Sequence, residues 1–145
     1  MSGYESREIV DLVIIGSLGF LSIVALAIVL NRAVFLWRVK IDAYDSPAAL
    51  ERALTKYMHL LASIGANAPY IGLLGTVVGI MVTFSVISVD GSDIAGVMKG
   101  LSSALFATGL GLTVAIPSVF FYNILLRGIK NKMTDWKLQH GREGV

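Results

Sequence analysis

The 145-residue sequence contains no cysteine and only two histidines, His59 and His140. The absence of cysteine excludes disulfides, iron–sulfur clusters and thiolate zinc sites. Neither histidine is supported by a second histidine or by paired carboxylates, so we predict no metal site. The chain also has no glycine-rich loop followed by Lys-Ser or Lys-Thr, and no nucleophile–base arrangement. We therefore expect a protein that is not an enzyme and that binds no cofactor.

Charged residues are scarce, at 15% of the chain, and three long apolar segments contain none of them. These segments are 12–30, 69–89 and 100–126. Each is long enough, as a helix, to cross a hydrocarbon layer of about 30 Å. The sequence therefore predicts an all-α, polytopic membrane protein of a single domain, 1–145, with three transmembrane helices that contact membrane lipids. We expect the helices to extend into two cytoplasmic segments, 31–68 and 127–145.

The positive charges predict the orientation of the chain in the membrane. Ten of the twelve Lys and Arg residues lie in the segments 31–68 and 127–145, and only Arg7 and Lys99 lie on the other side. Basic residues concentrate in cytoplasmic segments. We therefore expect a periplasmic N-terminus and a cytoplasmic C-terminus. Because topology explains the basic excess, no nucleic-acid partner is needed.

The first cytoplasmic segment contains a helix signal at Ser46-Pro47, a capping residue followed by proline at the first helical position. Apolar residues then recur at helical spacing, which predicts one amphipathic helix that leads toward the second span; they are Leu50, Leu54, Tyr57, Met58 and Leu61. Pro69 either starts the second span or kinks a longer helix. Trp136 and His140 are interpreted as surface residues of a soluble helical tail.

Small residues form stripes on the second and third predicted spans, a spacing that favours close helix packing. On the second span they are Gly72, Gly75 and Gly79, and on the third Gly100, Ala104, Ala107, Gly111 and Ala115. Two interpretations remain open. The stripes allow a partner helix to approach closely, or they serve contacts among identical subunits. Pro117 lies inside the third span and frees a carbonyl near Thr113, which neighbouring helices can tolerate.

The predicted spans hold no ionisable residue at depth, since Asp11 and Lys99 lie at their edges. An ion path normally needs at least one ionisable or coordinating group inside the membrane. Hydroxyls such as those of Thr76 and Thr108 can line a path but cannot carry a proton alone at neutral pH. Either the protein moves no ions, or a partner supplies the carboxylate.

Two stretches together resemble the ExbB/TolQ branch of the MotA/TolQ/ExbB family over about residues 60–127. Residues 66–81 read ANAPYIGLLGTVVGIM, with Phe84 one turn on. Residues 100–112 read GLSSALFATGLGL, followed by AIP at 115–117 and YN at 122–123. The order of the two stretches and the predicted orientation also match the family.

The resemblance implies a proton-driven motor subunit of the bacterial cell inner membrane. It implies a homopentamer around a central pore, and a dimer of single-span ExbD-type partners inside that pore. Each partner carries an aspartate that binds and releases protons as they flow. The work then passes through TonB to outer-membrane import. Thr76 and Thr108 match the pore-lining threonines, expected to hydrogen-bond that aspartate or water. Pro69 and Pro117 are expected to shape the helices.

The sequence departs from the family pattern in two places. Ser103 stands where better-known members often carry a glutamate, five residues before the threonine, so that glutamate is either dispensable or replaced. We group Ser103 with the residues expected to line the path. The cytoplasmic connection, about 31–67, is also short, which implies a reduced cytoplasmic domain. Two alternative functions remain: a TolQ-like subunit that serves envelope integrity, and a passive membrane scaffold without ion flow.

Overall fold

The computed structural model describes residues 3–90 and 94–141, and within these ranges the protein is helical with no strand. The prediction of an all-α fold is therefore confirmed. In chain order the elements are α1 (Gly3–Arg38), η1 (Ile41–Ala43), α2 (Pro47–Thr55), α3 (Met58–Asp90) and α4 (Ile94–His140). Much of the turn expected between Val89 and Lys99 is helical, and its centre, 91–93, lies outside the described residues.

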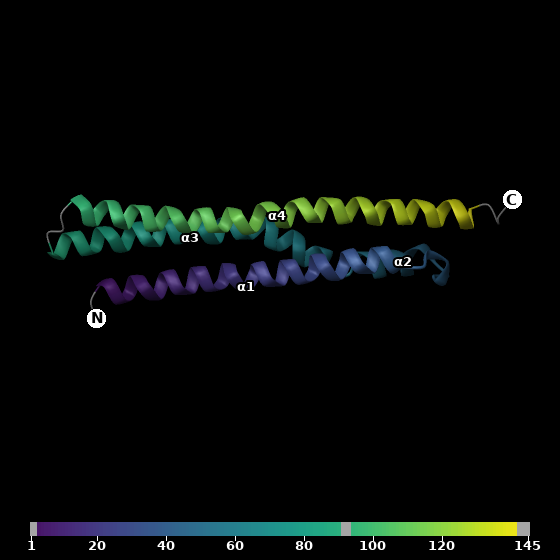
Figure 1. Ribbon diagram of the computed structural model, residues 1–145, viewed down its shortest axis with the longest axis horizontal. Coiled ribbons are helices and arrows are strands. Elements are labelled where there is room, and N and C mark those ends of the chain that lie inside the picture. Colours follow the sequence, from purple (N-terminus) through teal and green to yellow (C-terminus); the bar gives the residue numbers. More distant parts are fainter. Residues whose placement is uncertain (1–2, 91–93, 142–145) are drawn as a thin grey trace.

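Three of the helices, α1, α3 and α4, are long and apolar enough to cross a membrane. They have 36, 33 and 47 residues, which correspond to about 54, 50 and 70 Å at 1.5 Å per residue. Each exceeds the roughly 30 Å hydrocarbon layer. Figure 1 shows them side by side, with the start of α1 at one end of the molecule and α2 at the other. The uncharged segments therefore mark only the central parts of longer helices.

The surfaces of the three long helices are rich in exposed apolar side chains. Large examples occur along each helix, including Leu12, Ile23, Met81, Phe106 and Ile116. Such a surface would be costly in water and is favourable against lipid or a second apolar helix. The exposed apolar surface is therefore the kind expected of membrane-spanning helices.

The helix start at Ser46-Pro47 is confirmed, because the Ser46 hydroxyl accepts a hydrogen bond from the Ala49 N–H at 3.2 Å. The continuous amphipathic helix is wrong. The helix α2 ends at Thr55, and Tyr57 adopts a positive φ of 65° before α3 begins. The Tyr57 carbonyl then accepts hydrogen bonds from the first turn of α3. The apolar spacing carried no sign of this break, because buried leucines continue on both sides of it.

The helix α2, the first part of α3 and the second half of α4 share a hydrophobic core with the second half of α1. Its fully buried members come from α2 and the start of α3, namely Leu50, Leu54 and Leu61. They pack with residues of α1 and with Leu125 and Ile129 of α4. A second, smaller core lies nearer the start of α1 and is built around Ile14, Leu18, Ala68, Ala107 and Ala115. Together the two cores attach α1 to the α3–α4 pair along its length.

Pro69 lies inside α3, eleven residues after the helix begins at Met58, so the longer helix is the correct alternative. Proline removes the hydrogen bond to the carbonyl four residues back and favours a bend there. Figure 1 shows the first part of α3 leaving the side of α4 and crossing toward α2. Pro117 likewise lies inside α4, with the chain helical on both sides.

The interpretation of Trp136 and His140 as surface residues of a free tail is wrong. Trp136 is only 8% exposed, and its indole Nε1–H donates to the Tyr44 carbonyl at 3.1 Å. The His140 ring stacks on the indole with centroids 4.3 Å apart. These contacts attach the end of α4 to the connection between α1 and α2. The tail is therefore part of the packed structure.

Arg32, one of the residues counted for topology, is buried with 5% exposure. Its Nη1 donates to the Ala53 carbonyl in the last turn of α2 at 2.9 Å, and its Nη2 donates to Asn31 Oδ1 at 3.1 Å. The guanidinium lies 4.8 Å from the centroid of the Phe35 ring. A cation at a helix C-terminus is favourable, as is a cation over an aromatic face. Arg32 therefore fastens α2 onto α1.

Candidate functional site

The small-residue stripes of α3 and α4 face each other within one chain. A Cβ added to Gly72 would lie 2.7 Å from the Ala107 carbonyl oxygen, and one added to Gly111 would lie 2.6 Å from the Ala68 carbonyl oxygen. Only glycine permits backbones to approach so closely. The idea that these stripes await another helix, from a partner or an identical subunit, is therefore wrong for the buried glycines. Their close-packing surface is already filled by the same subunit.

The close contact between α3 and α4 continues from Gly72 toward the C-terminal end of α3 and the N-terminal end of α4. An added Cβ at Gly75 would lie 2.7 Å from the Ala107 Cβ, and one at Gly79 would lie 2.9 Å from the Ala104 Cβ. The two helices are thus in backbone-to-backbone proximity over several turns. This proximity brings short polar side chains on the facing surfaces within reach of the opposite backbone.

Thr76 and Thr108 form the polar centre of this contact. Their hydroxyl groups are hydrogen-bonded directly to each other across the two helices. The Thr76 Oγ1 also lies 3.2 Å from the Ala104 carbonyl oxygen, and the Thr108 Oγ1 lies 3.2 Å from the Gly72 carbonyl oxygen. Both side chains are half-buried. Two residues 32 positions apart in the sequence therefore make one site. The resemblance named both as pore-lining threonines but did not imply the hydrogen bond between them.

The two hydroxyl protons of this pair have two consistent arrangements. In one, Thr76 donates to Thr108, which donates to the Gly72 carbonyl; in the other, Thr108 donates to Thr76, which donates to the Ala104 carbonyl. Changing between them requires rotation of two hydroxyl groups and no movement of heavy atoms. In each arrangement one threonine oxygen accepts no bond from the other. The pair can thus accept a hydrogen bond from water or a protonated carboxyl group.

Thr83 shares the face of α3 that carries Thr76 but takes no part in this pair. It is buried, and its hydroxyl donates to the Gly79 carbonyl of its own helix at 2.8 Å. Its side chain fills the space opposite Gly100, where an added Cβ would overlap the Thr83 hydroxyl oxygen. Thr83 therefore acts in helix packing.

Ser103 lies apart from the threonine pair, on the side of α4 that meets α1. It lines a cavity of about 140 Å³ together with Asp11, Ile14, Ile15, Phe106 and Ala107. Asp11 was placed at the edge of the membrane by sequence reasoning, and the structure shows it half-buried in the α1–α4 contact. No sequence signal pairs the two residues, because the relative rotation of α1 and α4 is set by packing.

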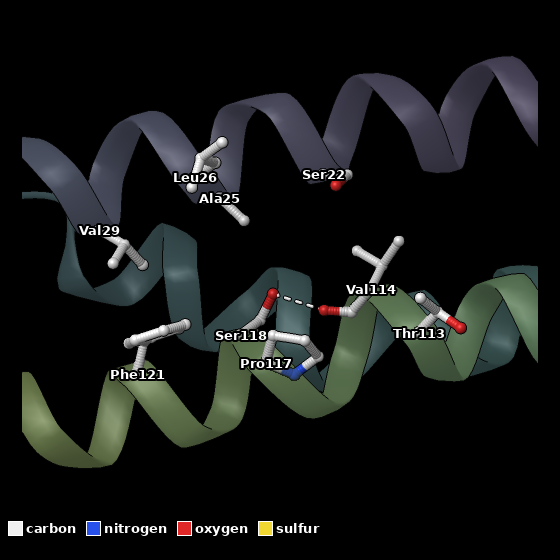
Figure 2. Close-up of a pocket in the computed structure, with 9 residues that line it drawn as sticks. All are labelled: Ser22, Ala25, Leu26, Val29, Thr113, Val114, Pro117, Ser118 and Phe121. Carbon is white, nitrogen blue, oxygen red and sulfur yellow. Dashed lines mark hydrogen bonds between the residues drawn. The ribbon is translucent and has the colours of Figure 1, made fainter.

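A second cavity, also of about 140 Å³, lies between α1 and α4 near Pro117. Figure 2 shows its lining, which is mostly apolar: Ser22, Ala25, Leu26, Val29, Thr113, Val114, Pro117, Ser118 and Phe121. The hydroxyl of Thr113 donates to the Gly109 carbonyl at 2.9 Å, and that of Ser118 donates to the Val114 carbonyl at 2.7 Å. Since these two hydroxyls bond to their own helix, this cavity offers little polar chemistry.

Metal chemistry finds no support in the described part of the chain, 3–90 and 94–141. There, no three His, Asp or Glu side chains gather where they could hold a metal ion. Of the polar side chains described above, Thr76 and Thr108 bond to each other across two helices, and Asp11 and Ser103 face one cavity from two helices.

Comparison with known proteins gives one matching family model and several similar proteins. Residues 39–138 match the model of the MotA/TolQ/ExbB proton channel family. The chain is 45% identical to the biopolymer transport protein ExbB of Aquifex aeolicus over 138 residues, covering 94% of this chain and 93% of that protein. It is 48% identical to an ExbB of Helicobacter pylori over 122 residues, covering 83% and 84% of the two chains.

A longer relative is matched over less than half of its length. The ExbB of Neisseria gonorrhoeae is 47% identical over 91 residues, which cover 62% of this chain but only 41% of that protein. The chain thus matches compact relatives over nearly their whole length and matches larger ones only in part.

Proposed function

The chain belongs to the MotA/TolQ/ExbB proton channel family, and we propose that it is the ExbB-type subunit of a proton-driven inner-membrane motor. In this proposal it couples the proton motive force, through a TonB-type protein, to import across the outer membrane. It has no enzymatic role and needs no cofactor. The proposal rests on the family and on one structural observation, the hydrogen-bonded pair of Thr76 and Thr108.

The threonine pair supports a path because it is polar, half-buried and free of fixed charge. A carboxyl group needs hydrogen-bond partners when it leaves water, whether it is protonated or ionised. The pair can accept from a protonated carboxyl group without losing its internal bond, and it can donate to an ionised one by turning a hydroxyl. Such a site keeps the costs of the two forms similar. Proton exchange there is therefore energetically accessible.

The carboxyl group itself is proposed to come from a partner. Neither α3 nor α4 carries an acidic residue in the membrane-spanning part of the threonine face. We assign this role to the aspartate of an ExbD-type single-span dimer, held in the pore of a homopentamer of this chain. Because the glycine faces are filled within the subunit, the partner meets surfaces made of larger exposed side chains.

The proposed location is the bacterial inner membrane, with a periplasmic N-terminus and a cytoplasmic C-terminus. Both basic segments lie at the end of the molecule that carries α2 and the end of α4, as the course of the chain in Figure 1 shows. Positive charge at one end favours that end as the cytoplasmic one. The threonine pair then lies between the periplasmic start of α1 and the cytoplasmic core.

Two substitutions test this function, Thr76→Val and Thr108→Val, with Thr113→Val as the matched control. Valine keeps the shape and removes the hydroxyl, and the Thr113 hydroxyl bonds only to its own helix. Losing a hydrogen bond to an ionisable group costs about 1.5–3 kcal/mol, which is roughly a tenfold or greater loss of rate. We expect energised uptake to fall by this factor in the first two variants and to be unchanged in the control.

Native mass spectrometry of each variant must show the same complex with the partner, so that loss of uptake is not loss of assembly. Uptake at the wild-type rate in both variants would contradict the path and favour a passive scaffold. A TolQ-like role would leave import unaffected by deletion of the chain and instead weaken the envelope against detergent. The relatives named ExbB favour import.

A further inference from the structure

The cavity between α1 and α4 that Ser103 lines has a carboxylate, that of Asp11, in its wall. Asp11 on α1 and Ser103 on α4 supply its polar lining, and the remaining walls are Ile14, Ile15, Phe106 and Ala107. Its volume of about 140 Å³ is sufficient for water molecules, each of which needs about 10–15 Å³ by this measure. Its two polar side chains offer water the partners it requires.

Asp11 differs in this respect from the other acidic residue of the same region. Glu8, one turn earlier on α1, is exposed, whereas Asp11 is half-buried against α4. A carboxylate against apolar walls is costly unless water or a hydroxyl solvates it. Since larger, uncharged side chains would pack here without that cost, fold stability does not explain an aspartate at this position.

One layer of packed side chains, which includes Ala107 and Ile14, lies between the cavity and the threonine pair. The cavity wall residue Ala107 directly precedes Thr108, and Ala107 also contacts the position of Gly75, which directly precedes Thr76. The Ile14 side chain reaches the same glycine, since an added Cβ there would lie 3.0 Å from Ile14 Cδ1. Asp11 therefore lies one turn before Ile14 on α1, and Ile14 packs against the glycine that precedes Thr76.

Resting on the proposed function, we infer that Asp11 is the subunit's own proton-exchanging group at the outer entrance of the path. Its carboxylate takes a proton from hydronium on the periplasmic side, which leaves water, and gives the proton to a water molecule on the threonine side, which becomes hydronium. Each transfer breaks one O–H bond and forms another, and the subunit returns to its starting state. Ser103 faces the same water, and its small side chain leaves the space that this water needs.

Among the side chains that the structure describes, the ionisable neighbours of Asp11 are Glu8 on α1 and Lys99 on α4, one turn before Ser103, and both are exposed. The charged residues Glu5, Arg7 and Asp90 lie outside the described side chains. The part of α3 from 60 to 85 contains no acidic or basic residue, so no fixed charge in that part competes with Asp11 for the proton.

The test moves the carboxylate across the cavity. Proton influx is measured in vesicles that contain the full chain and its single-span partner, for Asp11→Asn, for Asp11→Asn with Ser103→Glu, and for Glu8→Gln as the control. We expect Asp11→Asn to slow influx by roughly tenfold or more, as loss of a proton-transfer group does. The double variant, which returns a carboxylate to the cavity from α4, should recover most of the rate, and Glu8→Gln should match the wild type.

The outcomes separate this inference from the proposed function. Wild-type influx in Asp11→Asn, with slow influx in Thr108→Val, would overturn the role of Asp11 and leave the threonine path intact. Slow influx in Asp11→Asn that the added glutamate does not restore would also overturn it, since the residue would then act only on structure. Wild-type influx in both Asp11→Asn and Thr108→Val would overturn both proposals.

Discussion

Gly72 sits where α3 and α4 approach most closely around the threonine pair, so Gly72→Ala probes the whole arrangement. The added Cβ would lie 2.7 Å from the Ala107 carbonyl oxygen, 3.0 Å from Thr108 Cα and 3.2 Å from Gly111 Cα. All three atoms belong to backbone, so no side chain can rotate away. Ordinary contact begins at 3.4 Å, so the helices must separate by up to about 0.7 Å.

The energetic cost follows from two opposing effects. Overpacking of this kind costs about 1–3 kcal/mol. Replacing glycine by alanine inside a helix recovers up to about 1 kcal/mol through helix propensity. The same separation lengthens the contact from the Thr108 hydroxyl to the Gly72 carbonyl, now 3.2 Å. We therefore expect a net loss of up to about 2 kcal/mol in stability, and a slower proton path.

Thermal unfolding of the purified chain in detergent measures this effect, with Gly109→Ala as the matched control. Gly109 lies on the same helix as Gly111 but has no atom within 4 Å of an added Cβ. The control should therefore unfold at the wild-type temperature or above, and Gly72→Ala below both. If Gly72→Ala unfolds at the temperature of the control and keeps full uptake, the close approach of α3 and α4 is not what holds the pair together.

Two further predictions concern the end of the molecule that carries α2 and the end of α4. Trp136→Ala should destabilise the chain by about 3–5 kcal/mol, because a large buried side chain and its bond to Tyr44 are lost, whereas Trp37→Ala, at an 87% exposed position, should have little effect; thermal unfolding compares them. Arg32→Lys should cost about 1–3 kcal/mol, because lysine keeps the charge but loses the planar fork. Arg38→Lys at an exposed position is its control, and equal unfolding temperatures for the two lysine variants would contradict the role of Arg32.

The number and approximate positions of the membrane helices could be predicted because the length of a segment without charged residues can be counted directly in the sequence. The absence of charge in 12–30, 69–89 and 100–126 was enough to predict α1, α3 and α4. Most of the helix ends lie well beyond these segments, since a helix continues through charged residues once it leaves the lipid; the exception is the C-terminal end of α3, at Asp90. The extensions are stabilised by the core around Leu50 and Leu54, whose partners on α1 and α4 are far away in sequence.

The residues of the candidate site could be predicted from the sequence, but the contacts between them could not. Thr76 and Thr108 could be named from the resemblance and from the scarcity of polar groups. Their direct hydrogen bond depends on the rotation of α3 against α4, which no local pattern encodes. For the same reason the sequence did not show that Asp11 and Ser103 face one cavity. It also did not show that the glycine stripes pack against each other within one subunit, since periodicity identifies a packing face but not the surface that it meets.

The break at Tyr57 and the burial of Trp136 show the same limit at the end of the molecule that carries α2. A positive φ at a tyrosine has no sequence signature comparable to that of glycine. Trp136 follows several charged residues, a context typical of a solvated helix, yet its indole bonds to Tyr44, 92 positions earlier. The burial of Trp136 therefore depends on a contact that its own stretch of sequence does not contain.

Proton influx into vesicles under an imposed pH gradient tests the central claim most directly, that this chain provides the path and its partner the carboxylate. Three preparations are compared, which contain the chain alone, the chain with its ExbD-type partner, and the chain with a partner whose membrane aspartate is replaced by asparagine. We expect influx only in the second, and a loss of roughly tenfold or more when that preparation carries Thr108→Val. Equal influx in all three preparations, or none in any, would contradict the account.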